Sequence, residues 1–204
     1  MKAFYKPAVF LLSLIPFAFL VYYGFTGQLT ANPIEFITHY TGDWALYFLL
    51  ITLSITPLRI IANSNSFSRY RRMLGLFAFF HAWLHVTTYF VLDQFFDVQA
   101  ILNDIVKRPY ITVGFAAFVL LTPLAITSTQ KMVMRLGNRW RQLHSMIYLL
   151  TGLAILHYYW LVKADTRIPL TLASIFFMLL FLRLKWVKQA RNLLFQKKVI
   201  NRSS

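Results

Sequence analysis

The sequence predicts an all-α fold, a polytopic membrane protein whose six transmembrane helices form a single domain over residues 1–204. Three observations support this prediction. Of the 204 residues, 58% are hydrophobic and 13% are charged, whereas about a quarter of the residues of a soluble domain are charged. The apolar residues form blocks close to the roughly 20 residues that cross a bilayer. The charged residues lie between these blocks, with their signs segregated.

Each apolar block is expected to form one membrane-spanning helix. The first follows Lys2 and Lys6. Because its apolar run is longer than the core of a signal peptide, and no small-residue cleavage pattern follows it, we expect an uncleaved helix. The second contains Arg59, the one formal charge inside a block, and we find no Asp or Glu within any block. A carboxylate-based transport pathway is therefore disfavoured. The predicted spans are residues 7–25, 44–61, 73–92, 109–130, 142–162 and 168–182.

The distribution of charge predicts the orientation. With a cytoplasmic N-terminus, 17 of the 21 Lys and Arg residues fall on the cytoplasmic side, and all six acidic residues fall on the other side. Positive residues are retained in the cytoplasm, so both termini are predicted to lie there. The basic tail, residues 183–204, is expected to bind anionic lipid headgroups rather than nucleic acid, despite the net charge of +15. We find no internal repeat.

The candidate chemistry is that of imidazole, because histidines are the only side chains apart from Arg59 inside the predicted spans that carry or gain a charge near neutral pH. The rise of about 1.5 Å per residue places His85 and His157 at similar depths on two helices that run outward. Two neutral imidazoles facing each other across a bundle are the arrangement that clamps a b-type haem at both axial positions. The alternative reading is that these histidines only form hydrogen bonds between helices. The chain has no cysteine, which excludes iron–sulfur clusters and a thioether-linked haem.

The other three histidines are expected to differ from this pair. His144 marks a second level, near the cytoplasmic side, and an ideal helix turns it roughly 140° away from His157. The two therefore require either a bent helix or two differently placed haems. His81, one turn below His85, either competes as a ligand or packs, and we favour packing. His39 lies in an outer segment and is expected to be ordinary.

Eight short motifs, in the right order on a six-helix plan, resemble those of the MsrQ family, formerly YedZ. This family provides the haem-binding membrane subunit of the periplasmic methionine sulfoxide reductase system and belongs with the ferric reductase-like transmembrane proteins. The resemblance covers nearly the whole chain. The motifs are THYTG (38–42), ITPL (55–58), RRMLG (71–75), LH (84–85), RPY (108–110), TSTQ (127–130), RWRQLH (139–144) and HYYWLVK (157–163).

The resemblance implies one or two b-type haems with His85, His144 and His157 as axial ligands of the iron. In related oxidases and ferric reductases the third helix carries two histidines fourteen residues apart, but here Arg71 stands fourteen residues before His85. His144 would then share its iron with water or an unidentified group. Arg71 would pair a haem propionate through a bidentate hydrogen bond.

The resemblance also implies an electron-transfer role in the bacterial inner membrane. Electrons would pass from the quinone pool or a cytoplasmic flavin donor to a soluble periplasmic molybdopterin subunit, MsrP, which reduces methionine sulfoxide in oxidised proteins. Sulfoxide reduction itself is expected on that partner, so we expect no catalytic residue in this chain. FMN is also associated with the family, although the sequence contains no flavin or nicotinamide motif. The acidic outer loops are a candidate docking surface for the partner.

Two other functions are consistent with the residues alone. One is a stand-alone ferric or quinone reductase that uses the same haems without a protein partner. The other is a haem-free transporter or assembly scaffold, in which the histidines only tie helices together.

Overall fold

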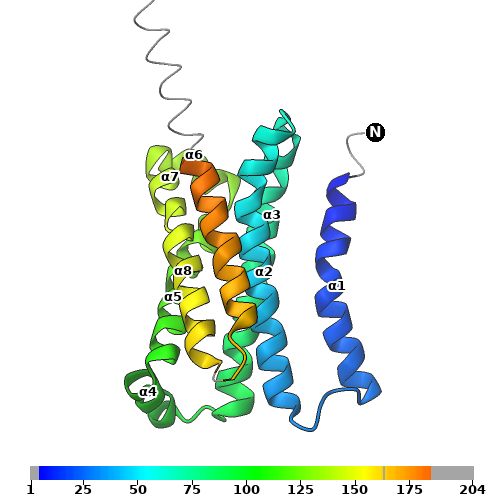
Figure 1. Ribbon diagram of the computed structural model, residues 1–204, viewed down its shortest axis with the longest axis vertical. Helices are drawn as coiled ribbons and strands as arrows, with labels where there is room; N and C mark the ends of the chain where they lie inside the picture. Colours follow the sequence, from blue (N-terminus) through cyan, green and yellow to red (C-terminus); the bar gives the residue numbers. More distant parts are fainter. Residues whose placement is uncertain (1–4, 163, 185–204) are drawn as a thin grey trace, which may run out of the picture.

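The computed structural model describes residues 5–162 and 164–184, and every regular element in these residues is a helix. The long helices run along one common direction, and α1 stands at the edge of the bundle (Figure 1). A further helix, Arg167–Leu184, follows α8. The basic tail from residue 185 onward lies outside the described residues. The other elements are α1 (Tyr5–Thr26), α2 (Pro33–Ile61), η1 (Asn65–Phe67), α3 (Ser68–Thr88), η2 (Tyr89–Asp93), α4 (Val98–Lys107), α5 (Pro109–Ile126), α6 (Gln130–Leu136), α7 (Asn138–Ser145) and α8 (Ile147–Leu161).

The two ends of the bundle carry opposite charge. At one end lie the start of α3 and the short helices α6 and α7 (Figure 1). We call this the basic end, after Arg59, Arg69, Arg71, Arg72, Lys131, Arg135, Arg139 and Arg141. At the other end lie α4 and the first turns of α2 and α5 (Figure 1). We call this the acidic end, after Glu35, Asp93, Asp97, Asp104 and Asp165. The fold thus brings together the like charges that are scattered along the sequence.

Helix α2 begins eleven residues before the predicted span, at Pro33 instead of residue 44. The Asn32 side chain caps it by accepting a hydrogen bond from the backbone N–H of Glu35, and Pro33 occupies the first turn, where no N–H is needed. Asp43 therefore lies inside a helix that is long and apolar enough to cross a membrane. The apolar block 44–61 itself contains no Asp or Glu, as the sequence showed, but the helix extends beyond it because a hydropathy pattern registers apolar runs and not helix caps.

The segment after the third span contains structure that was not predicted. Helix α3 continues as a π-helix, η2. It is followed by α4, whose N-terminus is capped where Asp97 accepts a hydrogen bond from the N–H of Ala100 at 2.9 Å. Helix α4 is amphipathic and lies at the acidic end of the bundle (Figure 1). Between η2 and α4, both Phe95 and Phe96 adopt left-handed backbone angles, with φ of 47° and 61°.

Five helices of the described chain are long and apolar enough to cross a membrane. They are α1, α2, α3 with η2, α5, and the helix Arg167–Leu184. The predicted span 142–162 is divided at Met146 into the end of α7 and the 15 residues of α8. The chain is a multi-pass membrane protein, and the count of six spans stays a prediction.

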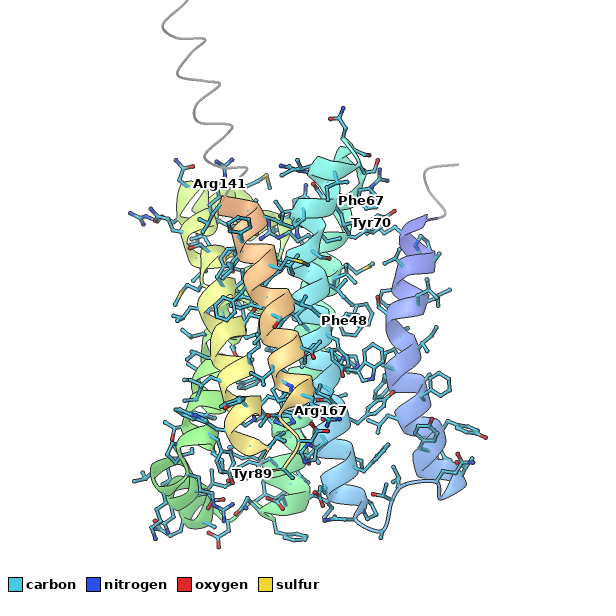
Figure 2. All side chains as sticks on the ribbon, in the orientation of Figure 1. Phe48, Phe67, Tyr70, Tyr89, Arg141 and Arg167 are labelled. Atoms are coloured by element: carbon cyan, nitrogen blue, oxygen red, sulfur yellow. The ribbon has the colours of Figure 1, made fainter. Side chains whose placement is uncertain are left out.

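The core of the bundle is formed mainly by α2 and α3, with α5 and α8 against them. Phe48 lies in its middle, stacked on Phe77 with ring centroids 5.6 Å apart (Figure 2). Buried hydroxyls bond to carbonyls of their own helix: Thr41 donates to Ile37 at 2.7 Å, and Thr151 donates to Ile147 at 2.6 Å. These bonds satisfy polar groups that would be costly to bury unpaired in a membrane protein.

Candidate functional site

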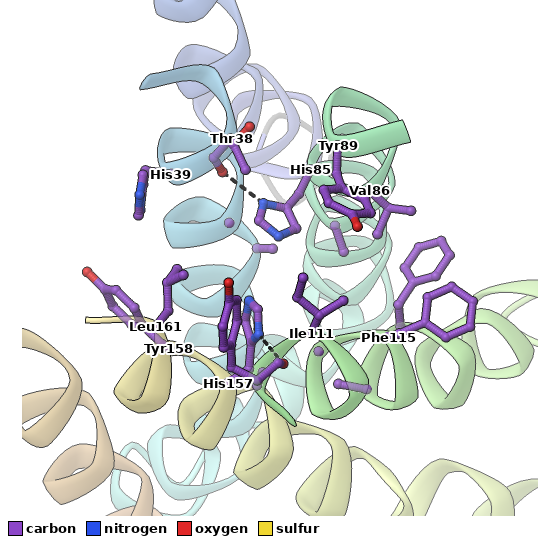
Figure 3. Close-up of a pocket in the computed structure, with 18 of the residues that line it drawn as sticks. Thr38, His39, His85, Val86, Tyr89, Ile111, Phe115, His157, Tyr158 and Leu161 are labelled. Atoms are coloured by element: carbon purple, nitrogen blue, oxygen red, sulfur yellow. Dashed lines mark hydrogen bonds between the residues drawn. The ribbon is translucent and has the colours of Figure 1, made fainter. Parts of the chain in front are cut away.

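His85 on α3 and His157 on α8 face each other across one cavity of about 480 Å³. Their ring centroids are 6.1 Å apart, and the ring planes are inclined by 78°. Both side chains point into the space between α2, α3, α5 and α8 (Figure 3). The two histidines that the sequence placed at similar depth are therefore close in space.

A backbone carbonyl holds each of these imidazoles. Nδ1 of His85 lies 2.8 Å from the Thr38 carbonyl oxygen on α2, and Nδ1 of His157 lies 2.7 Å from the Tyr110 carbonyl oxygen on α5 (Figure 3). Because a carbonyl oxygen can only accept, each Nδ1 must carry the proton and donate it. Each neutral ring therefore keeps an unprotonated Nε2, the atom available to a metal. This arrangement fixes both the tautomer and the ring orientation, as outer hydrogen bonds do at metal sites.

Two glycines make these contacts possible. Gly42 and Gly114 each follow the bonded carbonyl by one helical turn, where a side chain would otherwise stand beside it. A Cβ atom at Gly42 would lie 3.0 Å from Nδ1 of His85, and a Cβ at Gly114 would lie 2.6 Å from Nδ1 of His157. The second distance is shorter than real Cβ contacts allow. The absence of a side chain at Gly42 and Gly114 therefore lets each imidazole ring approach the helix backbone.

The two halves of the site are equivalent, and the second repeats the first 72 positions later in the chain. In each half, 47 residues separate the histidine from its carbonyl partner. The expectation that the chain has no internal repeat is therefore wrong at the level of structure, because the repeated positions are too sparse to stand out in the sequence. The equivalent cavity-lining pairs include Thr38 and Tyr110, Gly42 and Gly114, Ala45 and Ala117, Leu49 and Leu121, Ala82 and Ala154, and His85 and His157.

The cavity changes character along its length. Towards the core its walls are small or apolar side chains, among them Ala45, Ala117 and Leu121. At the acidic end the lining includes the carboxylates of Glu35 and Asp93 and the guanidinium of Arg108. A third carboxylate of the lining, that of Asp43, follows Gly42 on α2. A flat, mostly apolar ligand with a charged edge suits such a cavity.

Comparison with known proteins identifies the family. Residues 41–155 match the family described as "Ferric reductase like transmembrane component". A protein of Herminiimonas arsenicoxydans named "Protein-methionine-sulfoxide reductase heme-binding subunit MsrQ" is 54% identical over 92% of this chain and 87% of its own. Proteins of the same name from Rhodospirillum rubrum, 52% identical over 87% and 86%, and Polaromonas naphthalenivorans, 50% identical over 76% and 72%, also match. The chain belongs to the MsrQ family. No solved structure matches it.

The other two haem-site residues expected from the sequence, His144 and Arg71, both line a second, smaller cavity of about 150 Å³. His144 stacks on Trp140 with ring centroids 3.9 Å apart, and its Nε2 lies 3.1 Å from Thr127 Oγ1. The Thr127 hydroxyl donates its proton to the Pro123 carbonyl at 2.6 Å. It must therefore accept from Nε2–H of His144, which gives His144 the opposite tautomer to His85 and His157. Among the residues that line this cavity, His144 is the one histidine.

The two remaining histidines lie outside both cavities or at the rim. His81 is fully buried between the rings of Phe48 and Phe80, and its Nδ1 donates to the Phe77 carbonyl at 2.9 Å. It lines neither cavity, in agreement with the packing role expected from the sequence. His39 is half exposed at the acidic end, with Nε2 3.9 Å from a carboxylate oxygen of Glu35.

Sequence reasoning missed the polar residues at the acidic end of the larger cavity. Asp104 accepts a hydrogen bond from the Tyr89 hydroxyl at 3.0 Å and forms an ion pair with Nε of Arg108 at 3.1 Å. The Tyr110 hydroxyl and the Asp104 carboxylate both raise the pKa of Arg108, so its guanidinium stays charged. The signal was present in part, since the RPY motif contains Arg108 and Tyr110, but nothing in the motif shows that they reach the cavity.

Proposed function

We propose that this protein is a haem-binding electron-transfer subunit of a methionine sulfoxide reductase system, with His85 and His157 as the two axial ligands of one b-type haem. The observation that carries the proposal is the pair of imidazoles in the larger cavity. Each is held by a carbonyl so that Nε2 is unprotonated, and the two ring centroids are 6.1 Å apart. The MsrQ relatives are named as heme-binding subunits.

The residues present fit this cofactor. Metal–nitrogen bonds of about 2 Å on opposite sides of one iron would separate two imidazole centroids by roughly 6 Å, which agrees with the spacing observed here. No group of three or more His, Cys, Asp or Glu side chains that could hold a metal occurs in residues 5–162 and 164–184. Two protein ligands are too few for a structural zinc site. They suffice for haem, whose macrocycle provides the other four.

The chain's own contribution is to hold the ligands and exclude water. Haem, when bound, supplies one-electron redox chemistry. The carbonyls of Thr38 and Tyr110 accept hydrogen bonds from Nδ1–H of His85 and His157, and these bonds increase the basicity of the two Nε2 atoms. The apolar walls lower the local dielectric, and both factors tune the potential of the centre. Rigid helices carry all these groups, so little rearrangement has to accompany a change of charge.

We further propose a second haem at the basic end, with His144 as an axial ligand and Arg71 pairing a propionate. Both side chains line the smaller cavity, which supports a common site. Binding of iron by His144 through Nε2 would require the hydrogen bond to Thr127 to break. With two haems, one nearer each end of the bundle, an electron would cross the membrane in several short steps instead of one long one.

We propose six spans, with α7 and α8 together forming the fifth, and both termini in the cytoplasm. The grouping of basic residues at the end where α3 begins supports this orientation. The location would be a bacterial inner membrane. The basic tail would bind anionic lipid, with no role in binding nucleic acid.

The electron donor would be the quinone pool or a cytoplasmic flavin carrier, with FMN as a further candidate cofactor. The acceptor would be a periplasmic molybdopterin subunit of the MsrP type, on which the sulfoxide is reduced. The relatives' name, which places them in a protein-methionine-sulfoxide reductase, supports this acceptor. The acidic end of the bundle would then be the docking surface.

Spectroscopy of purified variants tests the proposal. His85→Ala and His157→Ala should each remove the reduced-minus-oxidised absorbance of the haem between them and leave only that of the second haem. Added imidazole should restore part of the lost absorbance by filling the vacated position. His39→Ala, at the rim, is the matched control and should keep its full absorbance. Full haem retention in both cavity variants would refute the ligand pair. A wild-type protein that stays colourless after expression with ample haem would refute the cofactor and favour a haem-free scaffold or transporter.

A stand-alone ferric or quinone reductase is the second candidate, because the family match carries the description of a ferric reductase component. Liposomes containing the protein and a reduced quinol distinguish the two. Oxidation of the internal quinol only when the periplasmic molybdopterin subunit and a sulfoxide are present outside would support the subunit role. Equal turnover with an external ferric chelate alone would support the reductase.

A further inference from the structure

The charged side chains that line the larger cavity are unequal in number. Three carboxylates, those of Glu35, Asp43 and Asp93, line it. Arg108 is the one Lys or Arg among the described residues that line it. A haem adds two more negative charges through its propionates, so like-charge repulsion would oppose binding unless a cation receives at least one of them.

The propionates of a haem in this cavity can point in one direction only. Ala45, Ala117, Leu49 and Leu121 line the deeper part, where an ionised carboxylate would be costly to bury. Glu35, Asp93 and Arg108 line the cavity at the acidic end, where a charged group is less costly to place. Arg71 cannot serve there, because it lines the smaller cavity at the basic end and not this one.

Arg108 is also held in place. Asp104 binds its Nε at 3.1 Å, and the second oxygen of the same carboxylate accepts from the Tyr89 hydroxyl at 3.0 Å. A guanidinium has five N–H donors in a planar fork, so the ion pair with Asp104 leaves donors for a second carboxylate. The backbone fixes its position further, because Arg108 immediately precedes α5, whose Tyr110 carbonyl holds His157.

We propose that Arg108 binds a propionate of the haem held between His85 and His157, and that Asp104 positions the guanidinium for this contact. The inference rests on the proposed haem function. Arg108 stands two positions before Tyr110, whose carbonyl oxygen holds the imidazole of His157. One short segment at the start of α5 would therefore hold both an axial ligand, through Tyr110, and a propionate, through Arg108.

Reconstitution of haem-depleted protein with two porphyrins tests the proposal. Protohaem has both propionates, and its dimethyl ester has none in ionised form. The variants are Arg108→Gln, which removes the charge, and Lys107→Gln, which removes an adjacent exposed charge that does not line the cavity. The readouts are the rate of haem transfer to apomyoglobin and the midpoint potential of the bound haem.

We expect Arg108→Gln to release protohaem about tenfold faster or more, because it loses a charge-assisted hydrogen bond. Its midpoint potential should fall, since a cation near the iron favours the reduced state. The dimethyl ester should leave wild type and Arg108→Gln at the same rate, and this equal binding also shows that the variant is folded. Lys107→Gln should match wild type with both porphyrins.

The two failures are distinguishable. If wild type and Arg108→Gln release protohaem equally, with the same potential, the assignment of Arg108 is wrong while the histidine ligands stand. If wild type binds neither porphyrin, the proposed haem function itself is wrong. If Arg108→Gln loses the ester as fast as it loses protohaem, Arg108 acts on the fold and not on a propionate, which also overturns the assignment.

Discussion

Nδ1 of His157 lies 2.7 Å from the carbonyl oxygen of Tyr110, on a stretch of helix where Gly114 leaves no side chain in the way. A helical carbonyl already accepts one intrahelical hydrogen bond, and it uses its second lone pair for the imidazole. The same contact occurs between His85 and Thr38 beside Gly42. Helical backbone therefore serves as the outer support of both candidate ligands, a role that a carboxylate often fills at metal sites.

Replacement of Gly114 by Ala should displace His157, since the new Cβ would lie 2.6 Å from Nδ1. Gly42→Ala should have a smaller effect, because the corresponding distance to His85 is 3.0 Å. We expect about 10–100-fold weaker haem binding for Gly114→Ala, measured by haem transfer to apomyoglobin. Gly152→Ala is the control, with its nearest neighbour 3.8 Å away. Unchanged binding in Gly114→Ala would show that the carbonyl contact does not support the ligand.

The substitution His81→Leu should leave the haem spectrum and potential unchanged. His81 lines neither cavity, its Nε2 has no hydrogen-bond partner among the described residues, and Leu153 occupies the equivalent position of the second half. Removal of an unpaired buried nitrogen should make the change close to neutral for stability, within about 1.5 kcal/mol. Optical redox titration and thermal unfolding in detergent would check both statements. A lost or shifted haem band would assign His81 to the site.

The substitution Thr127→Val should affect the proposed second haem alone. It removes the hydroxyl that accepts from Nε2–H of His144 at 3.1 Å. A hydrogen bond of this kind is worth about 0.5–1.5 kcal/mol net, so haem retention at His144 should rise roughly two- to tenfold. Thr122→Val, whose hydroxyl bonds only to the Phe118 carbonyl, is the matched control. A fall in retention would mean that Thr127 supports the site rather than competing for the imidazole.

Single cysteines can test the orientation without background, because the chain has none of its own. Ser66→Cys lies at the basic end, and Asn103→Cys lies on α4 at the acidic end, both exposed. In intact cells an impermeant maleimide applied from the periplasm should label Asn103→Cys and leave Ser66→Cys unlabelled. After cell disruption both should react. The reverse pattern in intact cells would place the acidic end in the cytoplasm and exclude it as the docking surface for a periplasmic partner.

Much of the fold could be predicted because a chain that crosses a bilayer needs apolar segments of a defined length, with charged residues between them. Apolar runs of the right length gave the long helices, and segregated charges predicted which loops gather at each end. The boundaries were less accurate. Helix α2 begins at Pro33 because Asn32 caps it, and α4 exists because Asp97 caps it, and neither effect contributes to hydropathy.

Part of the candidate site could also be predicted from the sequence. The depth of a residue follows from its position along a helix, so the matched heights of His85 and His157 could be estimated from the sequence. The direction in which a side chain points depends on how neighbouring helices are rotated. That rotation decides that His81 faces the core while His85, one turn away, faces the cavity.

The sequence by itself determined that this chain is a helical membrane protein with uncharged imidazoles inside its spans, because hydrophobic length and charge are local properties. Only the tertiary structure decided which groups meet. The contacts of His85 and His157 with carbonyls 47 residues earlier depend on helix packing, and so does the placement of Arg108 at the rim of the same cavity. Packing brings distant segments within hydrogen-bonding distance, and no local pattern encodes that distance.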